Sequence, residues 1–148
     1  EAEVKKIDKE QQKALEAKRA LVAEKRKRLN NTEWQVELRP LSGSTSAKDK
    51  KETDAILFKD NQVSIVGFEK KNFPPTNFTL SVQDDGIIVW ETMQTSEKNG
   101  IAFWRGEMDG DMQRMQGILS YHLDEKTIRD YSFVSVSKGN IVPVATGN

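Results

Sequence analysis

Apolar and polar positions change their spacing once along this chain, near residue 30. Residues 1–29 hold no Gly, Pro or aromatic residue and consist mainly of strong helix formers. Their few apolar residues recur at intervals of seven, as in Leu15, Val22 and Leu29. Later residues alternate between apolar and polar in short runs separated by turns. The pattern therefore predicts one long N-terminal helix followed by an antiparallel β domain.

The clearest strand covers residues 33–39, in which Trp34, Val36 and Leu38 alternate strictly with polar residues. A period of two places these three side chains on one buried face of a sheet. A long polar loop, residues 42–51, is expected to follow.

Seven further strands are expected, joined by short links, at residues 54–58, 63–68, 78–82, 87–91, 101–106, 112–123 and 128–136. Gly117 indicates a bend or bulge within its strand. Hairpins joined in sequence form a meander, and an eight-stranded meander avoids exposed edges by closing into a barrel. The predicted fold is therefore mainly β, an N-terminal helix followed by an eight-stranded antiparallel meander barrel. The alternative is a sandwich of two four-stranded sheets.

Three segments follow from this pattern. We expect a polar helical stalk over residues 1–30, a barrel domain over 31–137 and a flexible tail over 138–148. Within the tail, residues 141–144 have the apolar character of an edge strand.

The layout of residues 31–137 resembles the lipocalin-like, or calycin, barrels. The resemblance rests on a Trp in the first strand, Trp34, on the long first loop and on seven further strands. It implies a barrel that holds a small ligand, with an Arg stacked on Trp34, and Arg129 is the candidate for that role. The chain departs from these barrels in having Thr32 where they usually have Gly, and in lacking their final helix and disulfide.

Charge is balanced over the whole chain but unevenly distributed. Residues 1–29 carry ten Lys or Arg and six Asp or Glu, whereas the remainder carries thirteen and seventeen. A basic rod on an acidic body favours head-to-tail association or an acidic partner, and two solvated surfaces are the alternative. The basic cluster at 25–28 complements the helix dipole. Without interleaved aromatic residues it does not predict nucleic-acid binding.

The 148 residues include no Cys, which excludes disulfides, thiolate chemistry and Cys-based zinc sites. No apolar run approaches the roughly 20 residues that span a bilayer. The sequence starts at Glu1 rather than Met. We therefore expect an exported protein, periplasmic, secreted or tethered to a membrane through a missing leader; a cytoplasmic location is the alternative.

Aromatic residues are the main candidates for function. Three Trp and six Phe in a barrel of this size either line a ligand pocket or fill the core. Arg105 and Arg129 are the cations best placed to reach a pocket or its mouth. The candidate ligand-binding residues are Trp34, Trp90, Trp104, Phe103, Tyr131 and Arg129.

No catalytic, cofactor or metal motif is present. The single His, His122, follows Ser120 on the same strand face, but the two positions are roughly 6–7 Å apart along a strand and no orienting acid is evident. One His without Cys does not predict a metal site.

We therefore expect a non-enzymatic exported binding module that holds a small apolar ligand or a protein partner. The alternative is a structural or interaction domain with a filled core that dimerises through its N-terminal helix. A small barrel enzyme is the third hypothesis. Ligand binding predicts a void bordered by Trp and Phe. Dimerisation predicts that a second chain covers the apolar stripe of the helix. Catalysis predicts a carboxylate with a perturbed pKa, or His122, inside a cavity.

Overall fold

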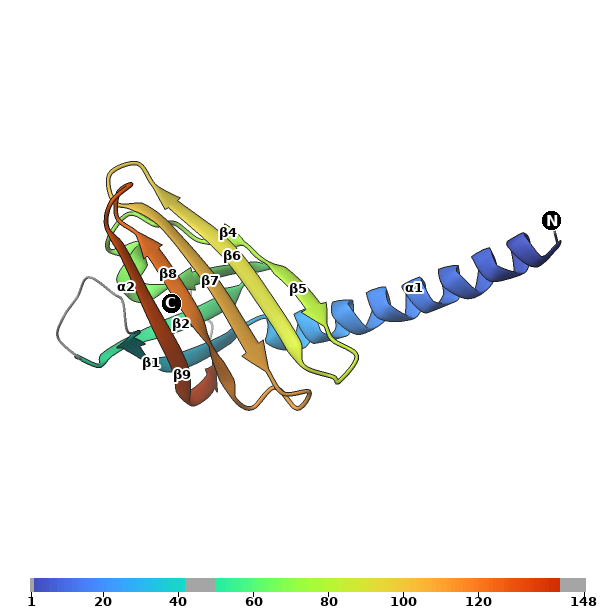
Figure 1. Ribbon diagram of the computed structural model, residues 1–148. Coiled ribbons are helices and arrows are strands. Elements are labelled where there is room, and N and C mark those ends of the chain that lie inside the picture. Colours follow the sequence, from blue (N-terminus) through green and yellow to red (C-terminus); the bar gives the residue numbers. More distant parts are fainter. Residues whose placement is uncertain (1, 42–49, 142–148) are drawn as a thin grey trace, which may run out of the picture.

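The computed structural model describes residues 2–41 and 50–141, with the side chains of residues 2–7 left aside. Residues 42–49 of the predicted polar loop and 142–148 of the predicted tail lie outside the described residues. Figure 1 shows a β barrel from which one long helix points away. The elements are α1 Ala2–Leu29, β1 Thr32–Pro40, β2 Glu52–Lys59, β3 Gln62–Ile65, α2 Val66–Glu69, β4 Thr76–Asn77, β5 Thr79–Val82, β6 Ile88–Ser96, β7 Gly100–Met108, β8 Met115–His122 and β9 Ile128–Asn140.

All the strands of the described residues belong to one antiparallel sheet, in the order β4-β3-β2-β1-β9-β8-β7-β6-β5. The first and last strands, β1 and β9, pair along their length, and the sheet curls into a nearly closed barrel (Figure 1). This confirms the predicted fold class of an N-terminal helix followed by an antiparallel, mainly β barrel. The chain does not form the alternative, two separate sheets packed face to face.

The structure has nine strands rather than eight because the strand predicted at 78–82 starts earlier and is interrupted at Phe78. The buried Phe78 separates β4, which pairs with β3, from β5, which pairs with β6. Across this break Thr92 Oγ1 of β6 donates a hydrogen bond to the Asn77 carbonyl oxygen at 2.7 Å. Among the described residues, β4 and β5 on either side of this break are the two edge strands of the sheet. The hydrogen bond from Thr92 partly bridges the gap between these edges.

The strand predicted at 63–68 was wrong in its second half, which forms the short helix α2. Gly67 N donates to Asp54 Oδ1 at 2.8 Å, and that carboxylate occupies the space that a Cβ at Gly67 would need. A contact between residues far apart in sequence thus turns the chain out of the sheet at Val66. The strand pattern alone does not contain this information.

The bulge predicted at Gly117 was also wrong. β8 pairs in regular register with both β7 and β9, and the sheet's irregularity lies instead in β1, between Gln35 and Val36. A Cβ at Gly117 would overlap the Arg105 carbonyl oxygen and lie 2.6 Å from Cζ of Phe133. The glycine is therefore needed for the close approach of the neighbouring strand and of an aromatic ring, and not for a bend.

The last turns of α1 close one end of the barrel. Leu29 is fully buried, and Val22 packs against the same core. The Arg26 guanidinium lies 4.5 Å from the ring centroid of Phe78 and donates to its carbonyl oxygen at 3.2 Å. Leu15 is 48% exposed, so the earlier turns do not pack on the barrel in the way that Leu29 does. Among the described residues, no helix combines the length and apolar character that crossing a bilayer requires.

We predict that Leu29→Ala lowers the free energy of unfolding by about 2–5 kcal/mol, because it leaves a cavity where helix and barrel meet. Leu15→Ala on the same helix should change it by less than about 0.5 kcal/mol. Urea denaturation followed by Trp fluorescence measures both. Equal effects of the two substitutions would contradict the view that only the end of α1 belongs to the barrel core.

Aromatic rings fill the interior of the barrel. Trp34, Trp90 and Trp104 are at most 2% exposed. Neighbouring ring centroids lie 5.1–6.5 Å apart in a continuous series of contacts through the core. We call the following series the aromatic chain: Phe78, Phe58, Trp90, Phe133, Trp104, Phe68 and Tyr121. Edge-to-face pairs at these separations add to the stability gained from burial.

Gly106 lets the aromatic chain pass close to the sheet, because a Cβ there would overlap the indole of Trp90. We predict that Gly106→Ala destabilises the protein by about 1–3 kcal/mol through overpacking. Gly139→Ala is the matched control, since no atom lies within 4 Å of its Cβ position in β9. If Gly106→Ala proved neutral in thermal unfolding, the interior would have free space beside Trp90.

Candidate functional site

Figure 1 shows α2 at the end of the barrel opposite α1. A cavity of about 420 Å³ is lined there by residues of β1, β2, β8, β9 and α2. We call it the mouth pocket. Its polar and aromatic lining residues are Glu52, Thr53, Asp54, Phe68, Lys71, Tyr121, Arg129 and Tyr131, and Leu38 and Leu119 add apolar surface. Its volume lies in the range of small-molecule sites.

Asp54 positions the floor of the mouth pocket. Its Oδ1 accepts hydrogen bonds from Gly67 N and Ala55 N, both at 2.8 Å. These bonds hold the start of α2 against β2, so that Phe68 points into the barrel end. The Phe68 ring lies edge-on to both Trp104 and Tyr121, at 5.3 and 5.1 Å. The floor is therefore continuous with the aromatic chain of the interior.

Arg129 enters the mouth pocket from β9. It lies opposite Tyr121 of β8, and alternation puts it on the same strand face as the buried Tyr131 and Phe133. Its Nε is buried and has no hydrogen-bond partner. Within the described part of the chain, no carboxylate forms a salt bridge with it. The pocket therefore contains a partly buried cation without a counter-ion.

Lys71 supplies a second positive charge at the rim. Its Nζ lies 5.1 Å from the ring centroid of Phe68 and 5.3 Å from that of Tyr121. The backbone is fixed beneath it, because the Lys71 carbonyl oxygen accepts hydrogen bonds from Asn99 Nδ2 at 2.7 Å and Ser96 Oγ at 3.3 Å. The ammonium group is thus held over the rings by cation–π attraction.

Both tyrosines of the mouth pocket have a raised pKa. For Tyr131, burial is the main cause and the charge of Glu52 adds to it, while the Arg129 guanidinium acts in the opposite direction. For Tyr121, burial raises the pKa and the charge of Arg129 partly offsets the rise. Both hydroxyls are therefore neutral at physiological pH, and that of Tyr121 donates to the Asn99 carbonyl oxygen at 3.0 Å.

Since Tyr121 and Tyr131 are the only tyrosines, we predict that both titrate in the native protein with midpoints above the ordinary pKa of 10.0. Folding favours the neutral phenol, so this stabilisation is complete below pH 10 and is lost as pH rises through the raised pKa values. Spectrophotometric titration tests this, with denatured protein as the reference. In Tyr131→Phe the titration of Tyr121 should remain, still with a raised pKa. If the tyrosines of the native protein titrated at the ordinary pKa, the burial of their hydroxyls would be contradicted.

The structure separates the sequence-predicted site residues into three places. Arg129 and Tyr131 come together in the mouth pocket. Trp34, Trp90 and Trp104 lie in the packed interior. Phe103, next to Trp104 on β7, points outward and is 41% exposed. Whether any of these residues contacts a ligand stays a prediction.

The cation recorded beside Trp34 is not Arg129 but Lys138, whose Nζ lies 5.1 Å from the indole. Arg129 and Lys138 lie near opposite ends of the thirteen-residue strand β9, so the two sites are distinct. Trp34 Nε1 donates to Thr32 Oγ1 at 3.0 Å, and Thr32 Oγ1 donates to the Leu29 carbonyl oxygen at 2.5 Å. Trp34 thus connects the barrel to the end of α1.

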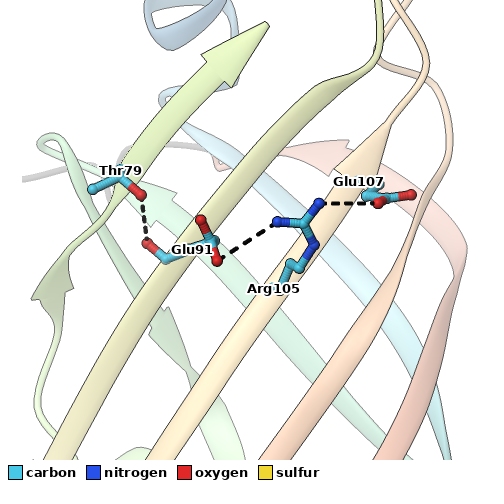
Figure 2. A network of polar contacts seen from close by, with 4 residues as sticks. All are labelled: Thr79, Glu91, Arg105 and Glu107. Atoms are coloured by element: carbon cyan, nitrogen blue, oxygen red, sulfur yellow. Dashed lines mark hydrogen bonds and ion pairs between the residues drawn. The ribbon is translucent and has the colours of Figure 1, made fainter. Parts of the chain in front are cut away.

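Arg105, the other arginine that the sequence suggested for a pocket, lies on the outer face of the barrel (Figure 2). Its guanidinium pairs with Glu91 at 3.6 Å and with Glu107 at 3.4 Å. Beside it an outer groove of about 480 Å³ is lined by Met93, Phe103 and Ile118 among others. The charge of Arg105 is therefore already matched by carboxylates of the protein.

Ser120, His122 and Asp130 also lie on the outer face. Ser120 Oγ donates to Asp130 Oδ1 at 2.7 Å, and His122 Nε2 lies 3.1 Å from the same Oγ. In a catalytic triad the histidine stands between the serine and the acid. Here the serine stands between the other two, so its proton is directed to the carboxylate and the arrangement differs from a triad.

Sequence reasoning missed the contributions of Asp54, Phe68, Lys71 and Tyr121 to the mouth pocket. Phe68 and Lys71 come from α2 and the turn after it, where a strand and a loop were expected. Tyr121 was the one residue with a usable signal, because it pairs with Arg129 if the last two predicted strands form a hairpin. The described residues include no group of three His, Cys, Asp or Glu able to hold a metal ion.

Comparison with known proteins found no match to a family model, to a curated protein or to a solved structure. The likeness to lipocalin-like barrels is therefore one of general shape.

Proposed function

We propose that this protein is a non-enzymatic binding module that holds a small ligand in the mouth pocket. The observation that carries the proposal is the combination of Arg129, a cation that forms no salt bridge among the described residues, with aromatic side chains in one cavity of suitable volume. Small-molecule sites typically combine an apolar lining with a few converging polar groups.

The packed interior supports a ligand at the mouth rather than in the middle of the barrel. Small barrels either fill their interior with side chains or hold one small ligand there. In this barrel the aromatic chain occupies the interior, and the three Trp are at most 2% exposed. A ligand at the mouth would rest on Phe68 and Tyr121, the last rings of that chain.

Binding without catalysis is supported by the polar groups of the pocket. Asp54 accepts two backbone hydrogen bonds, and the two tyrosines are held neutral by burial. The single His122 lies on the outer face beside Phe103 rather than in the mouth pocket. Export of the module remains part of the proposal, supported by the absence of cysteine from the sequence.

A second candidate function is association with another copy through α1. Leu15 and Leu21 are 48% and 38% exposed on a helix that points away from the barrel (Figure 1). Apolar side chains on a protruding helix are suited to a helix–helix contact. The mouth pocket lies at the opposite end of the barrel, so the two candidate functions do not exclude each other.

We predict that native mass spectrometry of protein purified without denaturation shows an excess mass of roughly a few hundred daltons over the 16.8 kDa chain. The excess should disappear on unfolding. Phe103→Ser, in the outer groove, should retain the excess mass and so serves as the control for location. A clean mass of two chains would favour association through α1, and a clean single chain would count against both candidate functions.

A further inference from the structure

We propose that the ligand of the mouth pocket is a small carboxylate with an aromatic or aliphatic body, and that Arg129 binds its carboxylate group. This inference rests on the proposed function, because it names the chemical class bound at the same site. It follows from a comparison of the inward-facing Arg129 with the outward-facing Arg105, which differ in the charges around them. The acidic residues that line the pocket then limit the charge of the ligand.

Arg129 and Arg105 differ in what neutralises them. Arg105 on the outer face lies between Glu91 and Glu107, as Figure 2 shows. Arg129 lies in a cavity, with a buried Nε that has no partner and no salt bridge to any described carboxylate. An arginine withdrawn from water without an anion is costly, and the guanidinium geometry matches a carboxylate with two parallel hydrogen bonds. In the described part of the chain the Arg129 guanidinium bonds to the neutral Tyr131 hydroxyl but to no carboxylate, and we therefore assign an external anion as its partner.

The acidic residues of the pocket restrict the charge of that anion. Glu52 and Asp54 of β2 line the same cavity as Arg129 and Lys71. Asp54 is held by two backbone N–H groups, and Glu52 acts electrostatically on Tyr131, which places its charge near the cavity. A phosphate dianion would meet repulsion from both acids. A singly charged carboxylate balances Arg129 with less repulsion.

The remainder of the ligand faces apolar surface. Phe68, Leu38 and Leu119 line the pocket below the guanidinium. Lys71 covers the rings of Phe68 and Tyr121 from the rim and adds a second attraction for the carboxylate. The body that fits is therefore a compact hydrocarbon or aromatic group, stacked on the floor with its carboxylate toward β9.

The test is an NMR titration of the full 148-residue chain with paired probes. A panel of aryl and alkyl carboxylates, such as 4-phenylbutanoate, is compared with matched neutral alcohols, such as 4-phenylbutan-1-ol. We expect carboxylates to shift the amide signals of Gly67, Tyr121 and Tyr131, and to bind roughly 10- to 100-fold more tightly than the alcohols. Arg129→Gln should remove that preference, and Arg129→Lys should restore part of it.

Arg105→Gln is the matched control, because Arg105 belongs to the same sheet but lies outside the pocket. This substitution should leave carboxylate affinity unchanged. The amide spectrum of each variant shows that it is folded. Equal binding of alcohols and carboxylates at the mouth would overturn the carboxylate inference and leave the proposed function intact. Absence of any shift at the mouth up to about 10 mM probe, or shifts confined to the outer groove, would overturn both.

Discussion

Packing of aromatic rings inside a narrow barrel is the constraint on which the rest of this structure depends. The interior of a small barrel has room for side chains or for a ligand, and Trp90, Trp104 and Phe133 occupy it here. Two strand glycines make this packing possible: Gly106 admits the indole of Trp90, and Gly117 admits the ring of Phe133. A small molecule held by the inner face of the sheet would then have to lie at an end of the barrel.

The two ends of the barrel differ because different elements cover them. At one end Leu29 is fully buried and is linked through Thr32 to Trp34, so helix and sheet share one core. At the other end, among the described residues, the short helix α2 lies against the barrel, and its Phe68 joins the aromatic chain without filling the space beside Arg129. Among the described residues, this second end carries the mouth pocket, with charged groups gathered around it.

Sequence alone predicted the elements that depend on local pattern. The alternation around Trp34 located β1, and the absence of Gly, Pro and aromatic residues located α1. It failed where a long-range contact decides the local structure: α2 exists because Asp54 binds Gly67 N, thirteen residues away. The prediction of a bulge at Gly117 was wrong for a related reason. A glycine within a strand can indicate either a bend or the close approach of a ring from another strand, and the sequence does not distinguish the two.

The same limit applies to the candidate site. Alternation states that Phe103 and Trp104 face opposite sides of the sheet, but strand pairing is needed to show that Trp104 is the inner residue. Arg129 and Tyr131 were identified as candidates from their strand. Phe68 and Lys71 were not, because the sequence pattern predicted a strand and a loop where the chain forms α2 and the turn after it.

Arg105 and Arg129 illustrate how position decides the chemistry of one residue type. Both are strand residues of the same sheet, but in the outer row Glu91 and Glu107 flank Arg105, whereas in the inner row the cross-strand neighbour of Arg129 is Tyr121. A neutral phenol with a raised pKa cannot neutralise a guanidinium as a carboxylate does. The outer arginine therefore contributes to the surface of the sheet, while the inner one is the residue that we propose to bind an anion at the mouth of the barrel.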